Sequence, residues 1–186
     1  MSNMSNVTNK TNLISAHGGY RKLKSFQTST LVYDLTLTFC QQFVKESRMR
    51  DQMVQAARSG RQNIAEGSQA SGTSKKTELK LVSVARASLE ELLLDYEDYL
   101  RHHNLKLWGK QSAEAQGVRA LAYKSDRTNA TYEAYLQSPE SFANVLLCLI
   151  HQANYLLDQQ LRSLEQAFLK DGGFTEKLYN VRKASR

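Results

Sequence analysis

Proline is almost missing from this chain, which has one proline and nine glycines in 186 residues. Proline breaks helix interiors, so its scarcity permits long helices. A β-sandwich needs frequent Pro/Gly turns and is therefore excluded. The chain has only two cysteines, Cys40 and Cys148, which lie far apart, and this count excludes a disulfide scaffold and a zinc ribbon. No apolar run approaches the length of about 18 residues needed for a membrane span, so we expect no membrane partner.

The N-terminus also lacks a basic start followed by an apolar block, so no secretory signal is expected and a cytoplasmic location is predicted. Residues 1–19 are rich in Asn, Ser and Thr and end in two glycines, which predicts a flexible polar arm. The length and the 41% hydrophobic content are those of one domain with a substantial core.

Acidic residues are fewer than basic ones. The chain has 18 Asp and Glu and 25 Lys and Arg, which gives a net charge of +7. The resulting pI is near 9.4. Such a balance favours anionic partners, of which nucleic acid is the main candidate.

Apolar residues recur at the helical period through most of the chain, which predicts an all-α protein. The expected architecture is an up-down antiparallel four-helix bundle over residues 20–170. Its helices are predicted at about 20–45, 48–69, 75–103 and 140–170. A long connection, 104–138, is expected to hold short helical pieces, and residues 171–186 form a basic tail.

Two of the predicted helices carry apolar residues outside their main stripe. In the first helix the expected core stripe comprises Leu23, Phe26, Tyr33, Leu37, Cys40 and Val44. A helix that is apolar on two sides must be covered on two sides, and a monomer would expose the second side. We therefore predict a homo-oligomer whose interface contains Leu31, Val32, Leu35, Phe39, Val84 and Leu94.

No pattern in the sequence points to catalysis. Cys148 and His151 lie one helical turn apart without an orienting third group, so a packed histidine is the better interpretation. The acidic residues and histidine that share one face of the third helix, namely Glu91, Asp95, Asp98 and His102, are interpreted as a solvated face. Phosphate-binding glycine loops are also missing. We expect no catalytic residue, no metal ligand and no cofactor, and therefore a protein that is not an enzyme.

Basic residues cluster on the second helix, at the start of the third helix and in the tail. Side chains of this type can contact a phosphate backbone with little sequence preference. The alternative, that they serve solubility and pair with acids such as Glu66 or Glu90, stays open. The candidate nucleic-acid-binding residues are Arg48, Arg50, Arg58, Arg61, Lys75, Lys76, Lys80, Lys177, Arg182 and Lys183.

Two stretches are distinctive, RDQMVQAARSGRQNIAEG over residues 50–67 and SKKTELKLVSVARASLEEL over residues 74–92. Together they resemble the bacterial four-helix-bundle family associated with intervening sequences of 23S ribosomal RNA genes. The accessory variability protein of diversity-generating retroelements is a cousin of that family. The resemblance covers about residues 20–103 well, and the Asn63–Gly67 segment is its core. We expect Asn63 and Glu66 to satisfy buried polar groups there.

The resemblance implies a four-helix protomer that assembles as a ring-like homopentamer without catalytic activity. In the retroelement cousin, the pentamer binds nucleic acid and a reverse transcriptase. Residues 1–19, the connection and the tail depart from the family pattern. The function predicted for this chain is a non-enzymatic homopentamer that binds RNA or DNA, as an accessory to a ribosomal RNA or retroelement process. The alternative is a protein-binding or assembly adaptor without nucleic-acid binding.

Overall fold

The computed structural model describes residue 14 and residues 17–124 and 126–184, and this part of the chain is all-α, with six α-helices and no strand. Two short 3₁₀ helices complete it. In chain order the elements are η1 (Tyr20–Lys22), α1 (Lys24–Phe43), α2 (Ser47–Ala70), α3 (Lys75–His102), α4 (Ala113–Leu121), η2 (Asn129–Tyr135), α5 (Pro139–Asp171) and α6 (Phe174–Ala184). Every predicted long helix is present, with ends that differ from the predicted ones by at most four residues.

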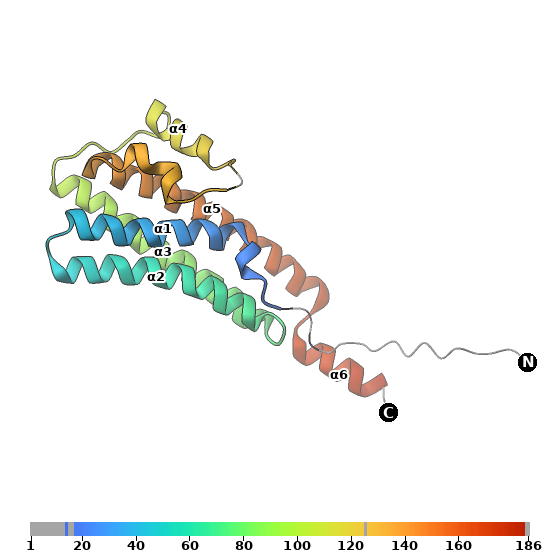
Figure 1. Cartoon of the computed structure of the whole chain (residues 1–186). Helices are drawn as coiled ribbons and strands as arrows, with labels where there is room; N and C mark the ends of the chain where they lie inside the picture. The colour runs from blue at the N-terminus through green and yellow to red at the C-terminus, as the bar shows by residue number, and fades with distance from the viewer. Residues whose placement is uncertain (1–13, 15–16, 125, 185–186) are drawn as a thin grey trace, which may run out of the picture.

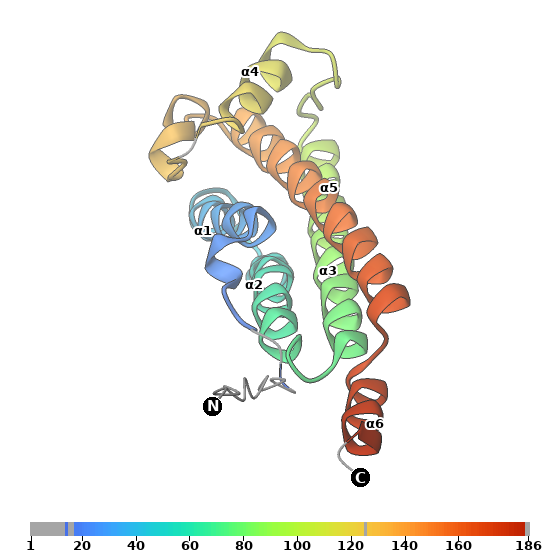
Figure 2. The same ribbon diagram turned by 90° about the vertical axis from the view of Figure 1, so that its right-hand side faces the viewer.

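The four longest helices lie side by side, and successive ones run in opposite directions (Figures 1 and 2). Helix α2 packs against α1 and α3, and α5 packs against the same two helices. Short turns join α1 to α2 and α2 to α3. Both termini of the described chain therefore lie at the end of the molecule where α1 begins and α5 ends.

Serine occupies the N-cap position of three helices, α3, α4 and α5, as expected from its preference for that position. The Ser74 side chain accepts from the Thr77 amide, and that of Ser112 accepts from the Ala115 amide. Ser138 caps α5, whose first residue is the single proline, Pro139. Proline is favoured there because its missing N–H would have no partner in the first turn.

Aromatic rings from three helices meet at the centre of the core. The buried Phe39 ring of α1 contacts the rings of Tyr96, Tyr99 and Phe142, with centroids 4.9–5.4 Å apart. The hydroxyl of Tyr96 is fully buried and donates to Thr36 Oγ1 at 3.0 Å. A buried hydroxyl without a partner would be costly, so this bond also fixes how α3 lies against α1.

The two apolar sides of α1 are the reverse of the predicted arrangement. The side assigned to an oligomer interface is buried within one chain, with at most 7% exposure, at Leu31, Val32, Leu35 and Phe39. The inference that a single chain leaves these four residues uncovered is therefore wrong. The physical reason is that α1 is packed between α2 and α5, with η2 also against it.

The side expected to be the main core stripe of α1 is only partly covered. Phe26, Tyr33 and Leu37 are half-buried, whereas Cys40 and Val44 are buried. On α3, Val84 and Leu94 are exposed at 39% and 55%, as predicted for a second face.

The connection between α3 and α5 folds back onto α5 and α1 (Figure 2). Its beginning is held by the buried Asn144, which accepts from the Trp108 amide at 2.8 Å and donates to the Lys106 carbonyl at 2.8 Å. The rest of the connection contains the expected short helical pieces, α4 and η2.

The two ends of the described chain are also ordered. Gly18 donates from its amide to the Ser68 carbonyl at 3.0 Å and accepts from the Ser68 hydroxyl, so the last part of the predicted arm is fastened to α2. The rest of the arm, apart from Ile14 and His17, lies outside the described residues. The basic tail is mostly the helix α6, which follows Gly172 and extends beyond the packed helices (Figure 1). Within the described residues, no helix has the length and apolarity required to cross a membrane.

Candidate nucleic-acid interface

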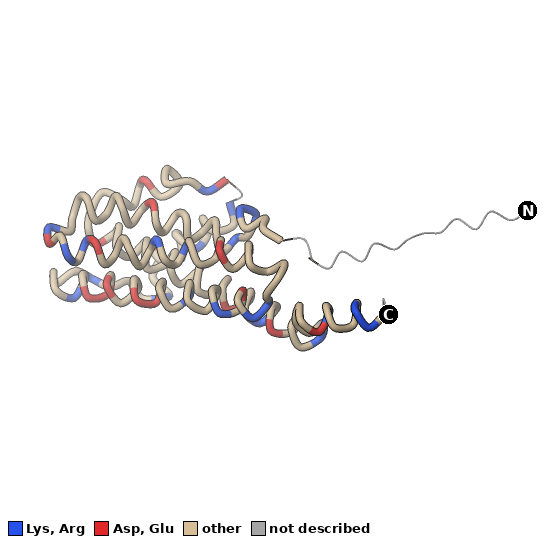
Figure 3. The backbone as a smooth tube through the Cα atoms, turned by 90° about the horizontal axis from the view of Figure 1, so that it is seen from below, with Lys and Arg blue, Asp and Glu red and all other residues tan. Residues whose placement is uncertain are grey.

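Three basic segments that are distant in the sequence lie at one end of the molecule (Figures 1 and 2). They are residues 20–24, residues 69–80 at the α2–α3 turn, and α6, and together they hold nine Lys and Arg against two Asp and Glu. Figure 3 marks these charged positions. We call this surface the basic end, and it comprises Arg21, Lys22, Lys24, Lys75, Lys76, Lys80, Lys177, Arg182 and Lys183.

Most side chains of the basic end face solvent, including Lys24, Lys76 and Lys80. Lys75 is half-buried and forms an ion pair with the buried Glu78 at 3.3 Å. Burial raises the pKa of the Glu78 carboxyl, and the nearby Lys75 ammonium partly offsets this. The Arg21 guanidinium lies 5.3 Å from the centre of the Tyr20 ring. The basic end thus presents cations with few competing acids, the arrangement that a polyanion requires.

The second half of α3 has the opposite character. Residues 90–98 hold five Asp and Glu and no Lys or Arg, and we call this stretch the acidic half. Asp95, at its centre, has a pKa raised to about 6 by burial and by the charges of Glu91 and Asp98. Because carboxylates repel phosphate, this part of the surface disfavours a polyanion.

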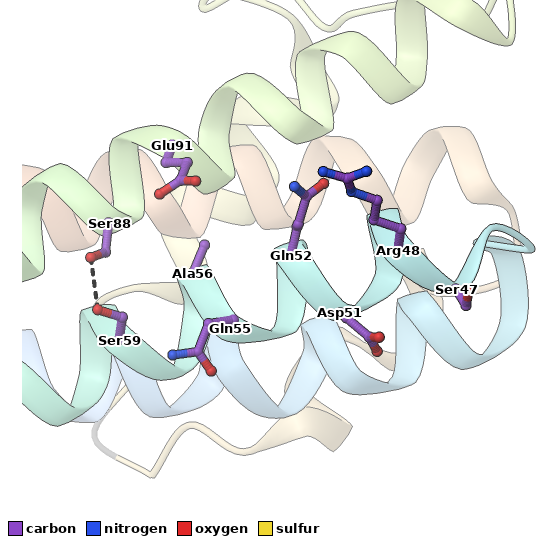
Figure 4. Close-up of a pocket in the computed structure, with 9 residues that line it drawn as sticks. All are labelled: Ser47, Arg48, Asp51, Gln52, Gln55, Ala56, Ser59, Ser88 and Glu91. Carbon is purple, nitrogen blue, oxygen red and sulfur yellow. Dashed lines mark hydrogen bonds between the residues drawn. The ribbon is translucent and has the colours of Figure 1, made fainter.

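Arg48 and Arg50, at the start of α2, lie beside the acidic half rather than at the basic end. Arg48 lines an open groove of about 540 Å³ together with Asp51 and Glu91 (Figure 4). The floor of this groove is polar, where the hydroxyls of Ser59 and Ser88 are 2.9 Å apart. Arg50 and Asp95 act in opposite directions on the pKa of the same buried thiol, Cys40. Arg48 therefore has acidic neighbours, and Arg50 and Asp95 both lie close enough to Cys40 to influence its pKa.

The two other predicted arginines of α2 differ from each other in their surroundings. Arg58 is exposed, whereas Arg61 is half-buried and places its guanidinium 4.2 Å from the centre of the Tyr33 ring. Arg61 also donates to Gln62 Oε1 at 3.3 Å. Because a cation over an aromatic face is stabilised there, Arg61 joins α2 to α1. The structure does not unite the ten predicted basic residues in one surface.

The Asn63–Gly67 segment is structural at Asn63, as expected, but not at Glu66. The side chain of Asn63 donates to the carbonyl and hydroxyl oxygens of Ser59 at 2.9 and 3.1 Å. Glu66 is exposed, so the expectation that its carboxylate satisfies a buried group is wrong. Ile64 and Gly67 instead face the core, and Gly67 lets α2 approach α3.

The geometry around the cysteines does not favour nucleophilic chemistry. Burial raises the pKa of Cys40 to about 12, and it also raises the pKa of Cys148. Both thiols are therefore protonated at neutral pH, and a thiol is a much weaker nucleophile than a thiolate. His151 is exposed. Glu91, Asp95, Asp98 and His102 do not converge, and the described residues contain no group of three or more side chains able to hold a metal ion.

One functional candidate was missed by the sequence reasoning, namely Arg127 in the connection. Its side chain reaches three different elements and lines a groove next to α1. The surrounding Asp126 and Thr128 form no motif, and the contacts of Arg127 span up to 99 residues of sequence. No local pattern could therefore have indicated its position.

Comparison with protein families identifies residues 22–107 as a match to the model described as 23S rRNA-intervening sequence protein. The matched segment contains α1, α2 and α3 and ends in the connection. This confirms the family resemblance drawn from the two distinctive stretches. Residues 108–186 lie outside the match. Searches of curated proteins and of solved structures gave no match.

Proposed function

We propose that this chain, which carries the 23S rRNA-intervening sequence protein family match over residues 22–107, is a non-enzymatic protein that binds RNA or DNA through its basic end. The contacts are made to phosphates and discriminate little between sequences. The four long helices act as an up-down antiparallel four-helix bundle that supports this surface. A cytoplasmic location and an accessory role in a ribosomal RNA or retroelement process belong to the same proposal, with a reverse transcriptase as a partner.

The observation that carries the proposal is the gathering of nine cations against two acids from three separate segments. Like charges brought together by folding repel one another, so such a cluster costs stability unless a partner neutralises it. A polyanion supplies that neutralisation and gains free energy from released counterions. The family description supports an RNA-related role.

We further propose a ring-like homopentamer, as the family resemblance implies. Five chains of charge +7 would carry +35. Weak contacts at each basic end could then act together on one polyanion. Exposed apolar side chains on α3 and α5 support an interface there, because Val84, Leu94 and Tyr155 are 39%, 55% and 63% exposed. Light scattering at micromolar concentration should give a multiple of 21.1 kDa, and a mass of one chain would contradict the oligomer.

Nucleic-acid binding is tested by fluorescence anisotropy with labelled single-stranded RNA and double-stranded DNA. The logarithm of affinity should fall linearly with the logarithm of salt concentration, by roughly 0.7–0.9 per phosphate contact. In the variant Lys24→Gln/Lys76→Gln/Lys80→Gln, three exposed cations of the basic end are lost. We expect an affinity loss of roughly tenfold or more and a slope lower by roughly 2–3.

The matched control removes three exposed lysines of the connection, Lys106→Gln/Lys110→Gln/Lys124→Gln. It has the same net charge as the test variant but an intact basic end. Equal losses in both variants would show that total charge matters and would contradict the location. If the folded wild-type protein binds neither nucleic acid at about 0.1 M salt, the proposed function is wrong and the adaptor alternative stands.

A further inference from the structure

A second basic feature adjoins the basic end and shares Arg21 with it, namely a groove between α1 and the segment that leads into η2. The groove has a volume of about 640 Å³ and is lined on one side by Phe26, Thr30 and Asp34. Arg127 and Asn129 line the other side, and Arg21 lies at one end of α1. One wall thus belongs to the family-matched segment and the other to the connection outside it.

The Arg127 side chain is fixed in this groove by three elements. It donates to Thr28 Oγ1 of α1 at 3.1 Å, to Gln152 Oε1 of α5 at 3.0 Å and to the Tyr132 hydroxyl of η2 at 3.4 Å. Thr28 and Tyr132 are fully buried. The guanidinium is therefore held in one place before any ligand arrives, which lowers the entropy cost of binding.

The bonds of Arg127 leave both charge and donors unused. All three acceptors are neutral, and the described residues provide no ion-pair partner for Arg127. A guanidinium has five N–H donors. Three are engaged, so two remain that can donate to a ligand in the groove.

The other charged groups that line the groove are Arg21 and Asp34, so two arginines stand against one aspartate. Arg21 is exposed and can move toward a bound anion. The side-chain amide of Asn129 adds a neutral donor, whereas the Thr30 hydroxyl already donates to the Phe26 carbonyl at 2.9 Å. A planar fork of N–H donors matches the oxygens of a phosphate group and binds them in pairs.

We propose that this groove binds a phosphate group, with Arg127 as the fixed donor and Arg21 as the mobile one. A free nucleotide and a nucleic-acid backbone offer the same group, and both fit the chemistry. The inference goes beyond the proposed function, because none of the basic-end lysines lines the groove, although Arg21 belongs to both surfaces. The competing interpretation is that Arg127 serves only to tie the connection to α1 and α5.

The test follows the arginine Nε–Hε resonances of the full-length, ¹⁵N-labelled protein by NMR. Inorganic phosphate, adenosine 5′-monophosphate and an eight-nucleotide single-stranded RNA are titrated separately, at an ionic strength held constant with sodium chloride. The Arg127→Lys variant assigns the resonance by its loss. We expect the Arg127 resonance to shift and saturate with at least one of these ligands, whereas sodium chloride leaves it unmoved.

Two surface variants test the site without disturbing the three structural bonds of Arg127. Arg21→Gln should weaken binding roughly two- to fivefold, because one cation of the groove is lost. Asp34→Asn should strengthen it by a similar factor, because the acid that faces the anion is neutralised. Arg119→Gln, on α4 and outside the groove, serves as the control and should leave the affinity unchanged.

The results separate the possible sources of the phosphate. Saturation by all three ligands identifies a site for small phosphates, and saturation by the RNA only identifies a backbone contact. An Arg127 resonance that moves with none of them overturns the proposal. An affinity that is unchanged in both Arg21→Gln and Asp34→Asn also overturns the proposal. The titrations with inorganic phosphate and adenosine 5′-monophosphate are repeated on the basic-end lysine variant. Because Lys24, Lys76 and Lys80 do not line the groove, a shift caused by these small ligands should persist there even if the variant no longer binds RNA, so the two proposals can fail separately.

Discussion

The two halves of α3 share one packing arrangement but carry opposite charge. The buried positions continue through both halves, with Val82, Ala85 and Leu89 in the first and Leu92 and Tyr96 in the second. Residues 75–89 hold four Lys and Arg and one Glu, the buried Glu78, whereas residues 90–98 hold five acids, none of them buried, and no Lys or Arg. In this helix the apolar core positions are therefore continuous, whereas the sign of the surface charge changes between the two halves.

The opposite charges of the two halves of α3 make the charge distribution asymmetric along the length of the molecule. The basic end lies where α3 begins, and the acidic half leads toward the opposite end. Ion pairs within the chain offset part of the charge of the acidic half, as Arg86 contacts Glu90 at 3.8 Å and Arg101 contacts Asp98 at 2.6 Å. A polyanion is thus attracted to one end and repelled from the middle of α3.

The largest effect on stability is expected where the two halves of α3 meet. A Cβ added at Gly60 would lie 2.6 Å from Leu89 Cδ2 and 2.7 Å from its Cγ, in the fully buried core. Gly60→Ala should therefore lower the free energy of unfolding by about 1–3 kcal/mol, although alanine favours a helix over glycine. Urea denaturation with circular dichroism measures the change.

Gly67→Ala is the matched control at another contact between α2 and α3. Its added Cβ would lie 3.4 Å from the Glu78 carbonyl oxygen and 3.4 Å from Leu81 Cβ, which is close to ordinary contact. We expect a change within about 1 kcal/mol of zero. If both variants changed the free energy of unfolding by the same amount, α2 and α3 would have room for a Cβ at Gly60, and the expected clash with Leu89 would be wrong.

Asp95→Asn tests the electrostatic cost of the acidic half. Folding raises the pKa of this carboxyl to about 6, so the folded state binds its proton more tightly than the unfolded state. The contribution of Asp95 to stability therefore decreases as pH rises from about 4 to about 6 and stays unfavourable above that. The asparagine variant should be more stable by about 1–2 kcal/mol at pH 8, a value reduced for partial solvent exposure.

Near pH 4 the same substitution should change stability little, because the wild-type carboxyl is then mostly protonated in the folded state. Thermal unfolding at pH 4 and pH 8 provides the comparison. A stabilisation of the same size at both values would mean that the charge of Asp95 is not the cause.

The smallest effect is expected for Arg48→Gln on nucleic-acid affinity. Arg48 shares its groove with Asp51 and Glu91, so a phosphate would gain little there. We expect a loss of less than about threefold in anisotropy measurements, smaller than that for Lys76→Gln at the basic end. A larger loss for Arg48→Gln than for Lys76→Gln would reverse the roles assigned to the two regions.

Local patterns were sufficient to predict the long helices and several of their ends. The period of apolar residues indicated α2 and α3 almost to their last residues, and Ser138 with Pro139 indicated the start of α5. These features depend on neighbours within a few residues, because capping and helical periodicity are short-range effects. They could not show which apolar side of α1 faces the core, since both sides are equally apolar.

Sequence by itself determined the all-α class, the excess of positive charge and the family match in the first three long helices. Only the tertiary structure decided which charges act together, because side chains up to 135 residues apart come into contact. In the folded chain, Lys24, Lys76 and α6 lie at one end, and Arg48 lies beside Asp51 and Glu91. Leu31 and Phe39 are buried within one chain. Electrostatic and packing energies depend on distance in space rather than on spacing along the chain.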